Sequence, residues 1–502
     1  MVVVALVAAA AAVSPVGDEW KHSKFYTPSG IQNVPRRHLI LAYRTARWFI
    51  GQAVQRHCGE RGYPMISVTA PLWVGLLIGI GFGIVASLWG IGNPETIIRA
   101  ARLVDRLLVG CFLLVTAVGA VVLYGLYAAG VSMHFSPKPT YVYGVVAGGI
   151  LFGVGIAISG YLPGTALVAL GEGRRDALAA VPGGLLGAAA WTVLYETPIG
   201  HWLVSAANLG DVVAGGNIHH VSPGRMLAIA AVYAVLALSV LYFLPRYRGS
   251  KHCCLRDIGG KSLDDHDRQM ARDTAEYLYE GARPASSRHT LLAQFSRHHV
   301  THPGFFMRTT AVVAVLVAML AVLSLFLRQQ FGQSTTYSWV VGKLFMPNYA
   351  YSREVAATIG WEPLSDLGVL IGAFLSAYFL SRRFTAFRPV TPPSWRNRFG
   401  PAPRKRAAAV FFGSFLTLFG ARMAGGCTSG HTLSGGVQLS LSAWVFTASF
   451  VVAMVLTARF VYRDARWQAA PEVKVASPEP LEPWAPPMRR SSVPTPADHD
   501  LR

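Results

Sequence analysis

Long apolar runs separated by short polar or basic segments dominate this chain. An α-helix needs about 20 apolar residues to cross a bilayer. The pattern predicts about nine such helices, at residues 70–92, 107–129, 141–160, 177–195, 224–244, 306–327, 366–381, 407–424 and 441–463. The run at 366–381 is short for a span and could begin earlier in the chain. We therefore predict an all-α, polytopic membrane protein.

Shorter apolar pieces lie between these runs. Residues 161–171 and 427–440 directly follow predicted spans and are too short to cross, so we expect them to be re-entrant. Segments 197–207 and 334–346 have a similar length and could simply lie at the membrane surface. The predicted domains are a basic N-terminal segment (1–69), a first membrane half (70–244), a soluble basic insert (245–305), a second membrane half (306–463) and a disordered tail (464–502).

The N-terminal segment has a pattern of its own. Between residues 36 and 61, apolar side chains fall roughly on one side of a helix with arginines around it, which favours an amphipathic helix at the membrane surface. The abundance of Arg also fits a mitochondrial presequence, and this alternative stays open. Residues 1–13 are apolar but too short to span, and their pattern assigns them no role.

The composition agrees with a membrane protein. Only 14% of the residues are charged and 52% are hydrophobic, with a mean hydropathy of +0.39, whereas soluble chains carry about 25% charged residues. The net charge of +20 would suit nucleic-acid binding, but the Lys and Arg residues lie in loops between apolar runs. Contact with the lipid bilayer explains them better, and no nucleic-acid partner is expected.

The basic residues also predict the topology. They gather in the loops after the first, third, fifth and seventh spans, including 245–305 and 382–406. Because positive loops stay in the cytosol, these loops should share the cytosolic side or its equivalent in an organelle. The basic N-terminal segment argues for the opposite orientation. The sequence leaves open whether the membrane is the plasma membrane or an organellar one.

The candidate chemistry is concentrated in the stretch from Gly420 to His431, GARMAGGCTSGH, between two predicted spans. Its glycines break the helix and allow backbones to approach closely. Irregular backbone at membrane depth persists only where it is buried in protein or lines a watery cavity, and polar groups there mark functional sites. This stretch supplies a thiol, two hydroxyls, an imidazole and a guanidinium.

Two other glycine-rich stretches end in a helix breaker in the same way, at 79–94 and 149–165. When Gly155 is aligned with Gly420, Leu162 meets Cys427. Interrupted hydrophobic segments at corresponding positions of two halves point to the binding site of a transporter. Glycine-rich helices also resemble one another through close packing alone, so the repeat by itself does not decide between the two explanations.

The C-terminal stretch GARMAGGCTSGHTLSG, followed by VQLSLSAWVFTASF, resembles the signature of the YeeE/YedE family of membrane proteins linked to sulfur transport. The stretch GGILFGVGIAISGYLPGTALVALGEG resembles its N-terminal counterpart. The resemblance covers about 70–195 and 365–463. It implies a helical membrane fold of two pseudo-symmetric halves, whose re-entrant helices meet where cysteines guide thiosulfate or a related anion. The family cysteine maps onto Cys427, and a cytosolic sulfur-carrier protein is a candidate partner.

One departure from the family matters for the mechanism. This chain has Leu162 where the family usually has a second cysteine, and no cysteine lies near residues 89–94. A relay of several thiols at matched positions is therefore absent from the sequence. We expect Leu162 to make this side of the site an apolar gate.

The residues of the motif suggest individual roles. Cys427 offers a weak, polarizable donor to the terminal sulfur of thiosulfate, and weak binding suits conduction; alternatively, it is a small buried hydrophobe. Thr428, Ser429 and Gly430 offer hydroxyl and N–H groups at a helix start, where anions bind. Ordinary N-capping would use the same groups.

Other polar or small residues flank the thiol. His431, four residues after Cys427, could tune the thiol or bind the anion, although a packing histidine is about equally compatible with the pattern. Arg422 could neutralise an anion or only pair with a helix end. In the other half, Gly164 and Thr165 could present a second helix start to the same anion.

These observations predict a membrane transporter or channel-like permease for a small sulfur-containing anion such as thiosulfate. Two alternatives stay open: a membrane enzyme that uses Cys427 and His431 as nucleophile and base, and an assembly protein without transport. We expect no enzymatic activity and no cofactor. We also expect no bound metal, since the five cysteines do not have the spacing of metal ligands.

Overall fold

The computed structural model describes residues 54–58, 64–103, 106–244, 303–380 and 391–462. The long helices among them are α3 (Val74–Trp89), α5 (Leu107–Ala128), α6 (Val142–Ser159), α8 (Ala180–Tyr195), α10 (Pro223–Phe243), α15 (Pro303–Leu327), α18 (Glu362–Leu375), α20 (Pro403–Met423) and α21 (Leu441–Val461). Shorter helices are α4 (Pro94–Ala101), α7 (Pro163–Gly171), α9 (Pro198–Ser205), α16 (Thr335–Leu344), α17 (Ala350–Thr358) and α19 (Pro393–Phe399).

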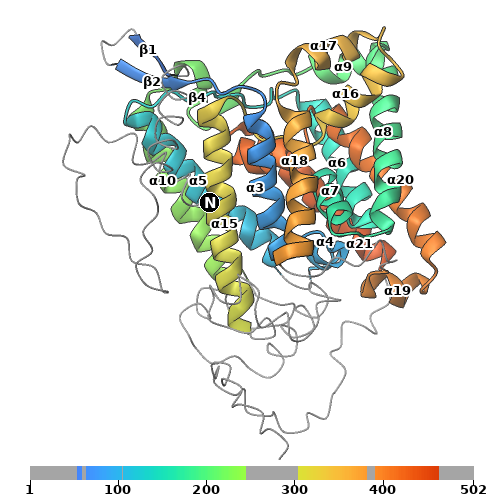
Figure 1. Cartoon of the computed structure of the whole chain (residues 1–502). Coiled ribbons are helices and arrows are strands. Elements are labelled where there is room, and N and C mark those ends of the chain that lie inside the picture. The colour runs from blue at the N-terminus through green and yellow to red at the C-terminus, as the bar shows by residue number, and fades with distance from the viewer. Residues whose placement is uncertain (1–53, 59–63, 104–105, 245–302, 381–390, 463–502) are drawn as a thin grey trace, which may run out of the picture. The chain divides into compact units, whose positions relative to one another are not determined.

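Each predicted span has a helix in the structure (Figure 1). By length and composition, the described residues hold seven helices that could cross a membrane, or eight if the bent pair of α3 and α4 is one span. The remaining predicted span is α20, whose first turn carries three basic residues. The run at 366–381 does extend toward its N-terminus, because α18 begins at Glu362. The chain is therefore a multi-pass integral membrane protein.

One of the two segments predicted to be re-entrant differs from the prediction. Residues 161–171 do not turn back, because α7 continues from α6 and the two form one candidate span of 30 residues, Val142–Gly171. The break between them is filled by an extended residue, Leu162, and Pro163 then restarts the helix. A sharper bend of 69° separates α3 from α4. Between α20 and α21, residues Ser429–Gly435 form a short, fully buried π-helix, η4.

The amphipathic helix predicted for residues 36–61 is wrong where the structure describes it. Strand β1 (Val54–Cys58) pairs antiparallel with β2 (Pro64–Val68), and Val54 lies opposite Val68. Gly59 and Gly62 lie between the two strands, and Pro64 takes the first position of its strand, where a missing N–H is tolerated. The other parts of the N-terminal segment, most of the insert 245–305 and the tail 464–502 lie outside the described residues.

Glycines bring α6 and α20 into backbone contact. A Cβ added to Gly148 would meet the carbonyl of Gly420, and one added to Gly420 would meet the carbonyl of Gly148. Gly155 and Gly413 are related in the same reciprocal way, so the two helices run antiparallel. The small residues of these helices are used for close packing, as in other membrane helix pairs.

The helices next to this pair also pack through glycines that contact a backbone. Glycines of α6 pack against the backbone of α21, and glycines of α8 pack against the backbone of α20. In both pairs the residue numbers rise together, so the helices are parallel. The antiparallel pair of α6 and α20 therefore has equivalent partners on its two sides, which is the arrangement expected of two inverted, pseudo-symmetric halves.

A left-handed glycine stands at each predicted break. Gly90 has φ +87°, Gly160 has φ +70° and Gly425 has φ +81°. Each follows a long helix and precedes a short one, namely α4, α7 and η4. Because the left-handed region is open to Gly at little cost, these residues let a helix stop inside the bundle and restart. The alignment of the two halves pairs Gly160 with Gly425, and the two have the same backbone conformation.

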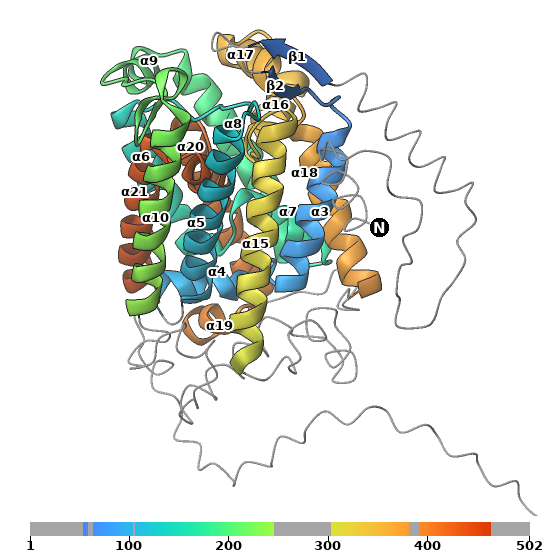
Figure 2. The same ribbon diagram turned by 90° about the vertical axis from the view of Figure 1, so that its left-hand side faces the viewer.

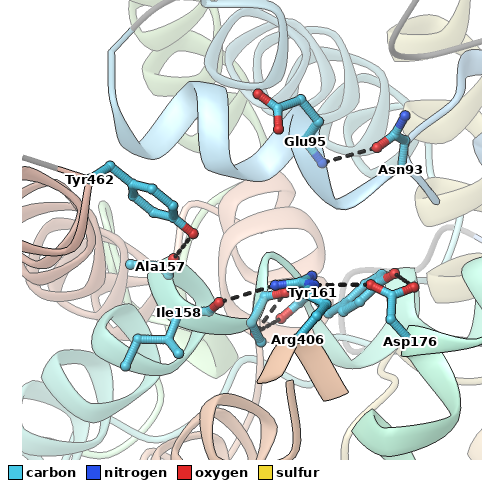
Figure 3. A network of polar contacts seen from close by, with 9 residues as sticks. Asn93, Glu95, Ala157, Ile158, Tyr161, Asp176, Arg406 and Tyr462 are labelled. Atoms are coloured by element: carbon cyan, nitrogen blue, oxygen red, sulfur yellow. Dashed lines mark hydrogen bonds and ion pairs between the residues drawn. The ribbon is translucent and has the colours of Figure 1, made fainter. Parts of the chain in front are cut away.

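The two ends of the bundle differ. In both ribbon views, α9, α16 and α17 lie at one end and α4 and α19 at the other (Figures 1 and 2). At the α4 end, Arg406 forms a buried ion pair with Asp176, with Nε 3.2 Å from Oδ2, and also donates to the carbonyls of Ile158 and Ser159 (Figure 3). This network joins α20 to the end of α6 and to the turn before α8.

Candidate functional site

The Cys427 thiol lies in the break between α20 and η4 and is only 1% exposed. The chain reaches it through Gly425, in the left-handed conformation, and Gly426. Sγ of Cys427 lies 3.0 Å from Oγ of Ser429. The carbonyl of Cys427 accepts a hydrogen bond from the His431 N–H, at 2.8 Å. The thiol is therefore held at the start of the short helix, as the motif predicted.

His431 is fully buried, and its ring nitrogens are not placed to act as a base for Cys427. Its Nε2 donates to the carbonyl of Ala424, at 2.9 Å, and its ring stacks on Phe446 with centroids 4.7 Å apart. Nδ1 is buried without a hydrogen-bond partner. Since Nε2 carries the hydrogen and Nδ1 meets no donor or acceptor, the geometry describes a neutral imidazole that ties the loop to the end of α20.

Arg422 lies at the same loop and is 5% exposed. Its guanidinium is held by hydroxyl groups: Nε donates to Tyr351, at 2.9 Å, and Nη1 donates to Ser334 and Thr335, at 3.2 and 3.1 Å. These partners carry no negative charge and fix the position of the guanidinium, while the Glu362 carboxylate of α18 offsets part of its field. Arg422 therefore places a buried positive charge near the thiol loop.

Lys138 is a second cation at this loop, and sequence reasoning did not assign it to the site. A Cβ added to Gly426 would lie 3.5 Å from Cε of Lys138, and one added to Gly430 would lie 3.8 Å away. Its charge interacts with that of Arg422. One signal was visible: Lys138 stands between two prolines and is the only Lys or Arg between Arg106 and Arg174.

Lys138 belongs to the loop between α5 and α6, outside the membrane-spanning helices. Its side chain is partly exposed, and the Ser442 hydroxyl donates to its carbonyl, at 2.7 Å. Burial lowers the pKa of Lys138 from its usual value, and the nearby Glu362 carboxylate raises it in part. The loss of charge on this side chain therefore falls at a lower pH than for a free lysine.

The first half contributes an apolar surface beside the thiol loop. Leu162 and Thr428 line one cavity of about 120 Å³, together with Ile97, Ile156 and Phe450. The Thr165 hydroxyl is occupied, since it accepts from the Leu162 N–H, at 2.8 Å, and so caps α7. Gly164 lies directly against the side chain of Gln333, so that no Cβ would fit there.

The predicted site residues therefore fall into two groups. The Cys427 loop and Arg422 lie together beside Lys138, whereas Gly164 and Thr165 serve packing and capping at the break of the other half. Leu162 does come near the thiol loop, through the cavity it shares with Thr428. No group of three or more His, Cys, Asp or Glu side chains that could hold a metal ion is found among the described residues.

Comparison with known proteins identifies the family of this chain. The model of the Sulphur transport family matches residues 97–456. The chain belongs to this family. A curated relative, the thiosulfate transporter TsuA of Spirochaeta thermophila, is 23% identical over 393 residues, which cover 78% of this chain and 99% of the relative. The residues matched by the family model include both helix breaks, the one between α6 and α7 and the one between α20 and η4.

Proposed function

We propose that this protein transports thiosulfate, or a closely related sulfur anion, past the thiol of Cys427. The observation that carries the proposal is the placement of this buried thiol in a loop flanked by two cations, Lys138 and Arg422. Positive charge attracts the anion, and the polarizable thiol distinguishes sulfur from oxygen at its terminal position. A single weak donor suits a permeating anion, because the ion must also leave.

The surroundings of the thiol support this assignment over a packing role. A structural cysteine needs only an apolar pocket, whereas Cys427 is surrounded by the hydroxyl of Ser429, an interrupted helix and positive charge. The relative TsuA carries thiosulfate in its name. The apolar cavity at Leu162 supports a hydrophobic constriction next to the thiol, since the sulfane end of thiosulfate is less strongly hydrated than its oxygens.

An enzymatic use of Cys427 is less well supported. A nucleophilic cysteine needs a base within hydrogen-bond reach, and the Nε2 of His431 instead donates to the carbonyl of Ala424. A cytosolic sulfur-carrier protein as acceptor of the anion rests on the family resemblance alone, and we keep it as a prediction.

Flux through the purified, full-length protein in liposomes tests the proposal. Thiosulfate and sulfate have the same charge and differ in one terminal atom, so sulfate is the matched control anion. We expect faster uptake of thiosulfate than of sulfate, and loss of thiosulfate flux in Cys427→Ala and Cys427→Ser. Cys111→Ala is the matched control variant, because Cys111 is also a free, buried cysteine. Full thiosulfate flux in a folded Cys427→Ala protein would overturn the assignment.

A further inference from the structure

A second buried ionisable group lies beside the site and has no part in the proposed anion contact. Asp366 lies in α18, inside a candidate span, and is 4% exposed. Neither carboxyl oxygen has a hydrogen-bond partner of good geometry. The Thr336 hydroxyl of α16 is the polar group that faces it. A buried carboxylate without donors or a cation is very costly, whereas the neutral acid costs far less.

The charged neighbours of Asp366 connect it to the anion site. Glu362 lies one turn earlier on the same face of α18, and its carboxylate accepts from the Thr335 N–H, at 2.6 Å. The charge of Glu362 acts on Asp366 on one side and on Lys138 and Arg422 on the other. A line of interacting charges thus runs from the cations of the thiol loop to Asp366.

The remaining neighbours are neutral or distant. The Tyr337 phenol of α16 interacts with both Asp366 and Cys427. Lys343 lies at the far end of α16 and is exposed, as is Tyr378 in the turn after α18. The two helices that pack most closely on α18, α3 and α7, carry no ionisable side chain. Among the described residues of α16 and α18, Glu362 and Tyr337 are therefore the ionisable groups whose charges interact with that of Asp366.

We propose that Asp366 is a proton-binding site that couples anion transport to proton movement; this inference rests on the proposed function. When the site is empty, the positive field of Lys138 and Arg422 favours ionisation of Asp366, and its proton leaves to water. When the anion is bound, its charge offsets that field, so the unpaired carboxylate is disfavoured and Asp366 takes up a proton. The proton and the anion are thus bound together, and each proton offsets one negative charge that the membrane potential would otherwise oppose.

The test uses the full-length protein in liposomes with a trapped pH indicator and a clamped membrane potential. Addition of thiosulfate to wild-type protein should move protons with the anion, and an imposed pH gradient should drive its accumulation. Asp366→Asn is nearly isosteric with the neutral acid. It should abolish both effects while exchange of labelled for unlabelled thiosulfate continues. Asp366→Glu should restore proton movement, and Thr336→Val should retain it.

A measurement on wild-type protein keeps the test independent of folding of the variants. A hydrophobic carbodiimide reacts with buried, protonated carboxyl groups, and mass spectrometry of the labelled protein should find the adduct at Asp366 together with loss of proton movement. Adduct formation elsewhere only, or proton movement that persists in Asp366→Asn, would overturn the inference. Thiosulfate exchange without proton movement in the wild type would overturn it and leave the proposed function standing, whereas absence of exchange would overturn both.

Discussion

The thiol of Cys427 and the hydroxyl of Ser429 are hydrogen-bond partners, with Sγ 3.0 Å from Oγ. Both groups are buried, and either can be the donor. The bond fixes the rotamer of the thiol at the beginning of η4. An anion that displaces the hydroxyl takes its place as the acceptor of the thiol hydrogen.

Ser429→Ala should therefore weaken anion recognition without removing the thiol. A hydrogen bond of this kind is worth about 1 kcal/mol, so we expect the KM for thiosulfate to rise by about fivefold. The matched control is Ser449→Ala, which removes a hydroxyl that donates to the carbonyl of Val445 within α21, at 2.8 Å. Equal KM values for the two variants would show that Ser429 does not position the thiol.

Close packing of α6 on α20 gives a second prediction. Replacement of Gly by Ala within a helix usually stabilises it by about 0.5–1 kcal/mol. At Gly155, however, the new methyl group would lie 2.5 Å from the carbonyl oxygen of Gly413. We expect Gly155→Ala to lower the free energy of unfolding by about 1–3 kcal/mol through overpacking, measured as a fall in the thermal unfolding temperature in detergent.

The chain offers a control for this variant in another helix. Gly125 lies within α5, and a Cβ added there would meet nothing within 4 Å. Gly125→Ala should leave stability unchanged or raise it. A similar fall in the unfolding temperature of both variants would show that the glycine substitution itself, and not the contact between α6 and α20, causes the loss of stability.

Much of the fold was predictable because membrane helices leave a simple signal. Each of the nine predicted spans contains a helix, and Gly425 and Cys427 lie at the break that the glycine cluster predicted. The break at residues 161–171 was also predicted, but its direction was not. Whether a helix turns back after a break depends on what its far end contacts, and α7 packs along α18, a relation that no local pattern encodes.

The site was predictable only where its residues are close in sequence. Cys427 and Arg422 belong to one motif, and the structure places them together. Lys138, Glu362 and Asp366 come from other parts of the chain, and their approach to the motif depends on how α5, α6 and α18 pack. An isolated Lys, in a loop that carries no other Lys, Arg, Asp or Glu, is a usable signal for such a residue.

The ion pair at the opposite end of the bundle gives a third prediction. Arg406 is 1% exposed, and its loss would leave the buried carboxylate of Asp176 without a cation, with the Tyr161 hydroxyl as its remaining donor, and would remove a donor from the carbonyl of Ser159. Removal of one member of a buried pair costs about 3–5 kcal/mol. Arg406→Gln should therefore lower the unfolding temperature strongly, whereas Arg404→Gln, at an exposed position of the same helix turn, should not. Equal stability of the two variants would show that the pair is not structural.

Lys138 gives the last prediction, and it concerns the attraction of the anion. Lys138→Gln should raise the KM for thiosulfate by about 3- to 10-fold at low salt and reduce the dependence of flux on ionic strength. Lys343→Gln is the matched control, because Lys343 is an exposed lysine, at the end of α16. An unchanged KM and salt dependence in Lys138→Gln would remove this residue from the site.

The pH dependence of flux tests the same cation in another way. Because burial lowers the pKa of Lys138, its positive charge is lost as the pH rises through a range below that of a free lysine. Thiosulfate keeps its charge over this range, so wild-type flux should fall with rising pH. Arginine stays protonated throughout, and Lys138→Arg should therefore keep its flux to a higher pH. Coincident alkaline profiles of the wild type and Lys138→Arg would assign the fall to another group and contradict the role of Lys138.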